Sequence, residues 1–225
     1  MDTAARQRWY DLVGPFGASD EAIDAALDDI VARYGEDHRH YHTIHHVLDV
    51  LGTLDELLLD PTTPPVAADD RSALRAAGWL HDVVYDPTRH DNEARSADLA
   101  RAVLTGLGVD PVVVDESARL IELTAGHEVG DDDHNGMLLA DADLAILGAA
   151  PDRYERYTEQ VRREYAHVPD EPFRAGRIAV LESFARRAPL FHTFAAVERF
   201  EELARENLRA ELDALAGLER DGVHR

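Results

Sequence analysis

The stretch AGWLHDVVYD (residues 77–86) places a histidine and an aspartate side by side at the end of an apolar run. Imidazole and carboxylate groups are costly to bury without a partner, so His81 and Asp82 need a physical reason. On a helix, His81 shares one face with three apolar residues: Leu74, Ala77 and Val84. We therefore expect His81 to face the core, either as a hydrogen-bonded structural histidine or as part of a metal site.

Helix signals recur along the chain, and strand signals hardly appear. Ser19 can cap a helix within 17–36, and Asp110 followed by Pro111 marks another helix start. The one β-branched run, VVV at 112–114, lies inside this second helical pattern. The sequence predicts an all-α fold of eight or nine helices in a single domain over 1–225. Its further helical segments are 45–58, 92–108, 151–168, 171–187 and 192–217.

Composition excludes several classes of protein. The 225 residues contain no cysteine, so any metal must be held by nitrogen and oxygen. All 23 basic residues are arginine, and the net charge of −22 argues against general nucleic-acid binding. No apolar run approaches the ~20 residues that cross a bilayer, and the N-terminus has no signal-peptide core. We expect a cytoplasmic protein that does not bind membranes; a homodimer is compatible with the sequence.

Histidines are concentrated just before the helical segment 45–58. Five of them lie within residues 38–46. His42 and His46 are four residues apart and would share a helical face if the helix began that early. The segment therefore offers a second group of imidazole ligands next to an apolar helix.

A pair of aspartates interrupts the apolar segment MLLADADLAILG (137–148). Residues two apart point to nearly opposite sides of a helix. Asp143 lies on the more continuous apolar face, so we expect it to face the interior. Asp141 is then expected to cap or support a neighbouring segment. A buried aspartate needs a cation or several hydrogen-bond donors.

These three segments together supply a candidate set of metal ligands: His46, His81, Asp82 and Asp143. Two imidazoles and two carboxylates suit one divalent ion among Mn, Fe, Co, Ni, Zn and Mg, and the residue types do not distinguish these metals. Four protein ligands on a six-coordinate ion leave two positions, one for water and one for a substrate oxygen. Such an arrangement is typical of metal-activated hydrolysis.

In order and in helical setting, the motifs YHTIHHVLDVL, WLHDVVYD and LLADADLAILG resemble the HD-domain superfamily of metal-dependent phosphohydrolases. The chain is most similar to a bacterial branch of predicted HD phosphohydrolases of unassigned substrate, whose later motifs match NEARSA, VRREY and ARENLRAEL. The resemblance covers about residues 40–215. It implies an HD-type helical bundle with a metal site in its core, and hydrolysis of a small phosphorylated molecule, with a nucleotide as the favoured example.

The resemblance also assigns roles by motif position. It makes His46 the first ligand, with His45 as the alternative, and Asp143 the last. His81 and Asp82 are the doublet that gives the superfamily its name. Some members bind two metals through two extra histidines, and this chain offers only His127 in a helical setting, because His90 and His134 lie in segments that look like loops. We therefore expect one metal ion, and a dinuclear iron oxygenase is the less favoured alternative.

Acid–base and substrate-binding residues are less sharply indicated. Glu93 or Asp86 could handle the proton of the attacking water, although Glu93 could equally complement the dipole of the helix that Asn92 opens. The expected substrate-binding residues are His42, His127, Arg162, Tyr165 and Arg177. Arginine suits phosphate because its guanidinium donates two parallel hydrogen bonds, but surface arginines also pair with carboxylates. A metal-binding regulatory protein that senses a nucleotide without hydrolysing it is the alternative function.

Overall fold

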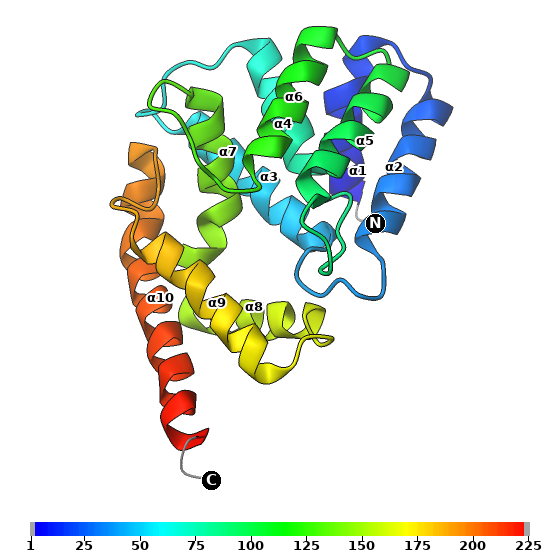
Figure 1. Ribbon diagram of the computed structural model, residues 1–225. Helices are drawn as coiled ribbons and strands as arrows, with labels where there is room; N and C mark the ends of the chain where they lie inside the picture. Colours follow the sequence, from blue (N-terminus) through cyan, green and yellow to red (C-terminus); the bar gives the residue numbers. More distant parts are fainter. Residues whose placement is uncertain (1–2, 223–225) are drawn as a thin grey trace.

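The computed structural model describes the backbone of residues 3–222 and the side chains of residues 3–217. Within this range there are ten α-helices, two short 3₁₀ helices and no strand, so the predicted all-α fold is confirmed (Figure 1). The α-helices are α1 (Thr3–Val13), α2 (Asp20–Tyr34), α3 (Ile44–Leu59), α4 (Ala68–Leu80), α5 (Asn92–Gly106), α6 (Pro111–Leu123), α7 (His134–Leu144), α8 (Pro151–Glu164), α9 (Asp170–Ala185) and α10 (Phe194–Gly222). The 3₁₀ helices are η1 (Gly14–Phe16) and η2 (Ala145–Gly148).

The expected number of eight or nine helices was too low, because α1 was missed. Its buried side chains, Ala5, Trp9, Leu12 and Val13, are few, although they recur at helical spacing. The ring of Trp9 is fully buried and meets Trp79 of α4 edge to face, with 5.5 Å between the ring centres. Packing of this kind stabilises a helix whose own sequence signal is weak.

Capping residues start several helices where the sequence predicts. Ser19 accepts a hydrogen bond from the backbone N–H of Ala22 at the start of α2. Asp110 accepts from the N–H of Val112, and Pro111 is the first residue of α6. Each cap satisfies a backbone donor that has no partner within the helix.

Two predicted helix boundaries differ in a way that bears on function. α3 begins at Ile44, so His42 precedes the helix and does not share a helical face with His46. α4 ends at Leu80, and His81 follows with helical dihedral angles while its N–H still donates to Ala77. Residues 82–91 are irregular, so Asp86, a candidate to handle the water proton, does not continue the helix that carries His81.

The helices from α1 to α7 lie side by side in one bundle, and α8, α9 and α10 pack at its edge with α10 extending away (Figure 1). One cluster of buried apolar side chains runs through both parts. Within the bundle, α3, α4 and α7 contact one another. Gly78 allows a close approach, because a Cβ there would lie 3.0 Å from Leu51 and 3.2 Å from Leu54 of α3.

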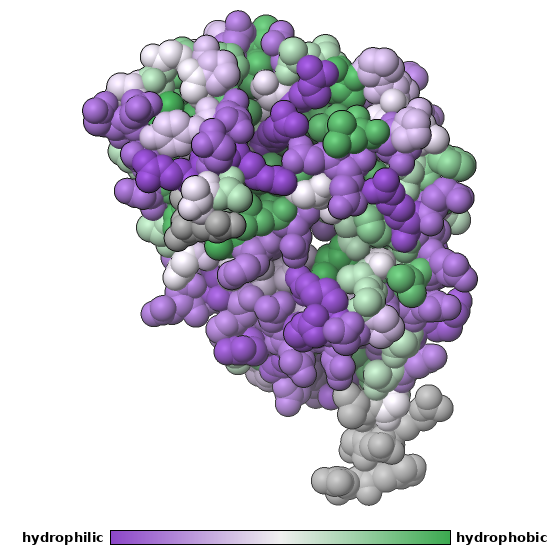
Figure 2. Space-filling model, turned by 180° about the vertical axis from the view of Figure 1, so that it is seen from behind, coloured by the Kyte–Doolittle hydropathy of each residue, from purple (hydrophilic) through white to green (hydrophobic). Residues whose placement is uncertain are grey.

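Hydrophilic side chains cover most of the face seen in Figure 2, as the composition leads us to expect. Among the described residues, no helix combines the length and apolar composition that a membrane crossing requires. Even α10, the longest helix, has charged residues throughout.

Candidate metal centre

Three helices bring His46, His81 and Asp143 together in the core. His46 comes from the first turn of α3, His81 from the end of α4, and Asp143 from the last turn of α7. One ligand atom from each lies within 4.8 Å of the others, so the group could hold a metal ion. The Nε2 atoms of His46 and His81 are 3.0 Å apart, and Oδ1 of Asp143 lies 3.1 Å and 3.5 Å from them. These distances fit a shared ion, since metal–ligand bonds of about 2.0–2.3 Å place ligand atoms roughly 3 to 4.5 Å apart.

The orientation of His81 favours a cation at this point. Its Nδ1 lies 3.2 Å from the carbonyl oxygen of Gly78 and donates to it, which leaves Nε2 as the atom with the free lone pair. Both imidazoles are buried, His46 at 3% and His81 at 1% exposure. Two buried ring nitrogens that face each other need a proton or a metal ion between them.

Asp82 adjoins this group from the turn after α4. Its Oδ2 lies 3.1 Å from Nε2 of His81 and 3.6 Å from Nε2 of His46. Burial raises the pKa of the Asp82 carboxyl, but the positive charges of His81 and His42 outweigh burial and hold this pKa below its usual range. The carboxylate is therefore ionised at neutral pH and available to a cation.

Asp143 is held in place by His127, which is not one of the candidate ligands. Its Oδ2 accepts a hydrogen bond from Nε2 of His127 at 2.8 Å, while Oδ1 faces His46 and His81. Burial raises the pKa of Asp143, but the charge of His81 and the bond from His127 bring it well below the usual value. His127 has a φ of 50°, an uncommon backbone conformation for a residue with a side chain. Arg187 donates to its carbonyl oxygen and so helps to hold that conformation.

Asp141 and His45 lie near the group but face elsewhere. Asp141 is as buried as His81, but its two carboxylate oxygens accept from the backbone N–H groups of His192 and Thr193, each at 2.7 Å. It therefore caps the start of α10, the supporting role expected for it. His45 is exposed on the outer side of α3.

Glu164, at the end of α8, was missed by the sequence reasoning. Its side chain is fully buried and accepts from the backbone N–H groups of residues 40, 41 and 42. It also accepts from Nδ1 of His42 at 2.7 Å and from the hydroxyl of Tyr85 at 3.0 Å. These bonds keep residues 40–42 out of the helix that follows. The motif VRREY holds this glutamate, but no local pattern distinguishes it from the many surface acids.

Two cavities meet at the candidate ligands. The smaller, of about 180 Å³, is lined by Asp82, His42, His127 and Glu93, and the larger, of about 410 Å³, extends along α3. The two cavities have four lining residues in common: Tyr41, His46, Asp143 and Ile146. His42, His127 and Glu93 of the sequence-derived candidates thus gather beside the candidate ligands.

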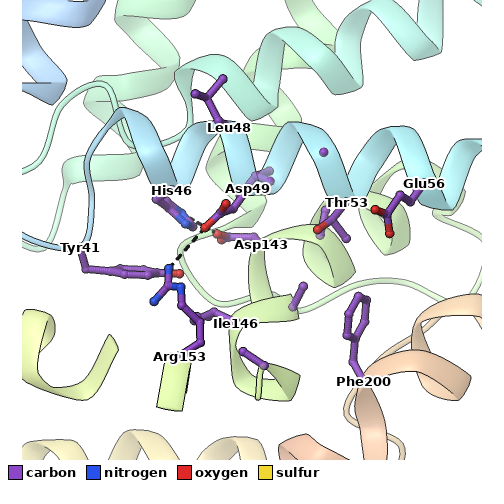
Figure 3. A pocket seen from close by; sticks show the side chains of 15 residues that line it. Tyr41, His46, Leu48, Asp49, Thr53, Glu56, Asp143, Ile146, Arg153 and Phe200 are labelled. Atoms are coloured by element: carbon purple, nitrogen blue, oxygen red, sulfur yellow. Dashed lines mark hydrogen bonds and ion pairs between the residues drawn. The ribbon is translucent and has the colours of Figure 1, made fainter. Parts of the chain in front are cut away.

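The larger cavity contains a cation that the sequence reasoning did not select. Figure 3 shows Arg153 of α8 beside Tyr41, with one ion pair to Asp49 at 3.3 Å. Among the described side chains, Arg153 is the only arginine that lines either of the two cavities. It sits within a regular arginine-rich helix, so its sequence neighbours give no sign that it differs from them.

Asp86 lies outside both cavities. Its Oδ1 accepts from the N–H and the hydroxyl of Thr88, at 2.9 Å and 2.7 Å, in a turn within 86–89. The cause of the difference is the end of α4 at Leu80, which turns this residue away from the candidate ligands.

Three of the expected substrate-binding residues also lie outside both cavities: Arg162, Tyr165 and Arg177. Arg177 is enclosed by a two-nitrogen bond to Glu211, at 2.8 Å and 3.0 Å, which ties α9 to α10. Arg162 donates to two backbone carbonyls and to Asp170. These arginines stabilise the packing of the C-terminal helices rather than line the candidate site.

Neither His90 nor His134 approaches the candidate ligands. Both are exposed, and His134 is the first residue of α7 rather than part of a loop. Of these three histidines, only His127, the one expected to lie in a helical setting, lines the smaller cavity.

The chain was compared with protein-family models, curated proteins and solved structures. No protein-family model matches the chain, and no curated protein or solved structure matches it. The described residues therefore establish an all-helical protein with a buried His–His–Asp group that could hold a metal ion.

Proposed function

We propose that the protein is a metal-dependent phosphohydrolase of the HD type that acts on a small phosphorylated molecule. The convergence of His46, His81 and Asp143 within 4.8 Å at the junction of two cavities is the observation that supports this most strongly. Asp82 is the fourth ligand in this proposal, since its Oδ2 lies within 3.6 Å of both imidazole nitrogens. A divalent ion held there would supply a Lewis acid for the activation of water.

The side chains of the smaller cavity are suited to move the proton of the attacking water. Glu93 is half-buried at the start of α5 and lines this cavity together with Asp82 and His42. A carboxylate at that place can accept a proton from water and pass it to the leaving oxygen. His42, whose Nδ1 is bonded to Glu164, presents its Nε2 at 4.0 Å from Asp82 and is suited to bind the phosphate.

The larger cavity is suited to hold the rest of the substrate. Arg153 can neutralise a phosphate oxygen near His46 and Asp143, since only one of its nitrogens is used by Asp49. Further along the cavity, Phe200 and Ile146 offer apolar contacts, and Thr53 and Glu56 offer polar ones (Figure 3). This mixture favours an organic phosphate ester with hydroxyl or amino groups, of which a nucleotide is an example.

A panel of phosphate esters, assayed with Mn²⁺ and after chelation, tests the proposal. We expect phosphate release from at least one ester, dependent on metal and abolished in His81→Ala. Metal retained by the wild type without hydrolysis of any ester would favour the alternative, a regulatory protein that binds a nucleotide.

A dinuclear iron oxygenase is a second candidate because His127 lies beside Oδ2 of Asp143, where a second ion could bind. Elemental analysis of the purified protein separates the two. One ion per chain supports the hydrolase, and two irons per chain support the oxygenase.

A further inference from the structure

A separate cavity of about 640 Å³ lacks the acidic excess of the chain. It lies where the segment after α2, the segment before α5 and the end of α8 meet. The whole chain has 45 acidic residues for 23 arginines, but this cavity has three carboxylates against three arginines and three histidines. The arginines are Arg33, Arg95 and Arg163, and the histidines are His38, His40 and His167.

The three carboxylates of the cavity already have donors. Glu164 is fully buried and accepts from three backbone N–H groups and two side chains. Asp86 accepts twice from Thr88, and Glu36 accepts from Nε of Arg39 at 3.1 Å. Their oxygens therefore have hydrogen-bond partners within the protein before any ligand arrives.

The arginines, in contrast, retain unused donors. Within the described residues, the side chains of Arg95 and Arg163 are exposed and make neither a hydrogen bond nor an ion pair. Arg33 uses its Nε for Asp29 and keeps its two terminal nitrogens free. In a protein with twice as many acids as arginines, guanidinium groups with free donors that line one cavity indicate a site for an external anion.

This cavity is distinct from the two beside the candidate metal ligands. It shares no lining residue with either of them. The segment 38–42 separates them: His38 and His40 line this cavity, while Tyr41 and His42 line the smaller metal-side cavity. Arg39 fastens this segment to the segment before α5 by donating to the carbonyl oxygens of Asp82 and Val83, and the two segments lie together below α5 in Figure 1.

We propose that this cavity binds a small phosphate-bearing anion at a site separate from the metal centre. Guanidinium groups match phosphate oxygens in pairs, and imidazoles add further donors. The volume falls within the range of roughly 300–1,000 Å³ that is usual for small-molecule sites. The site does not depend on the proposed hydrolase activity, because none of its residues belongs to the metal centre.

Calorimetric titration of pyrophosphate into the full chain, kept metal-free with EDTA, tests the proposal. We expect one binding event for the wild type and a Kd weakened about tenfold or more in Arg95→Gln/Arg163→Gln, since two charged donors are removed. The matched control is Arg101→Gln/Arg156→Gln, on the same two helices, which changes net charge equally but removes arginines that pair with Glu122 and Asp152. Its Kd should equal that of the wild type.

Three results would overturn the proposal. The first is no binding of pyrophosphate to the wild type, and the second is an equal loss of affinity in both double variants, which would indicate general charge attraction. The third is a loss in Arg153→Gln instead, which would place the anion beside the metal ligands. Each result is read without catalysis, so a failure here is distinguishable from a failure of the hydrolase proposal.

Discussion

The fully buried carboxylate of Glu164 holds the imidazole of His42 through a bond of 2.7 Å to Nδ1, although 122 residues separate them in sequence. This bond leaves Nε2 of His42 facing Asp82 and the smaller cavity. Burial raises the pKa of the Glu164 carboxyl, but the hydrogen bond and the charge of His42 outweigh burial and lower this pKa to about 2. Burial lowers the pKa of His42, while the charges of Asp82 and Glu164 raise it above its usual value.

Glu164→Gln should reduce stability in a pH-dependent way. Because the pKa of Glu164 falls from 4.5 to about 2 on folding, its contribution, on the order of 3 kcal/mol, is present above pH 4.5 and is lost as the pH falls towards 2. The contribution of His42, with its raised pKa, is present below pH 6.5 and is lost as the pH rises through the raised value. Denaturant unfolding in EDTA should show the largest difference from the wild type between about pH 4.5 and 6.5. Glu155→Gln, an exposed position on the same helix, is the control, and a difference that does not vary with pH would contradict the pairing.

Removal of His46 should abolish the stabilisation that a metal provides. For the wild type, a metal concentration about 100-fold above Kd should stabilise the fold by about 2.7 kcal/mol, or about 5–10 °C in Tm. His46→Ala should show no such shift in a thermal melt with Mn²⁺ or Zn²⁺. His45→Ala removes the exposed neighbouring imidazole and should keep the full shift. Equal shifts in both variants would show that the metal binds elsewhere.

The two aspartates of α7 should separate metal binding from packing. Asp143→Asn should lose metal and turnover, since Oδ1 of Asp143 faces both imidazoles. Asp141→Asn should keep the metal but lose about 1 kcal/mol of stability, because Asp141 caps the start of α10. Metal content measured by mass spectrometry and the free energy of unfolding provide the two readouts. The opposite ranking would move the ligand to Asp141.

Glu93→Gln should keep the metal and slow turnover about 10²–10⁴-fold, the usual contribution of a positioned acid or base. Glutamine preserves the size of the side chain but does not accept the proton. The comparison variant is Asp86→Asn, which should keep the wild-type turnover. The Asp86 carboxylate lies in a turn with Thr88 and outside the smaller cavity that Glu93 lines. Turnover on an active ester is the measurement, and an unaltered rate in Glu93→Gln would remove this residue from the mechanism.

Arg153→Gln should raise KM for the ester about tenfold with a smaller change in kcat, because its charge binds the phosphate before and during the reaction. Arg156→Gln removes an exposed arginine one turn along α8 and should change neither constant. Steady-state kinetics at fixed metal concentration measure both. An unchanged KM in Arg153→Gln would leave the larger cavity without a role in phosphate binding.

The sequence by itself determined the all-helical fold and the chemical types that meet in the core. Caps such as Ser19 and Asp110 act within a few residues of the helix ends that they stabilise, so their effect is readable from local spacing. The same holds for the apolar face that directs His81 and Asp143 inward, because helical periodicity is a local property.

Only the tertiary structure decided which polar residues reach the site. Glu164 and Arg153 lie in one arginine-rich helix with Arg162, and their spacing does not show which of them face the cavities. The contact of Glu164 with residues 40–42 depends on how α8 docks across the end of α3. Such docking is set by packing between distant segments. α4 also ends at Leu80, which leaves Asp86 in an irregular segment outside the two cavities beside the candidate ligands. The residue types of the candidate metal centre were therefore predictable from local pattern, whereas the charges around them depended on long-range contacts.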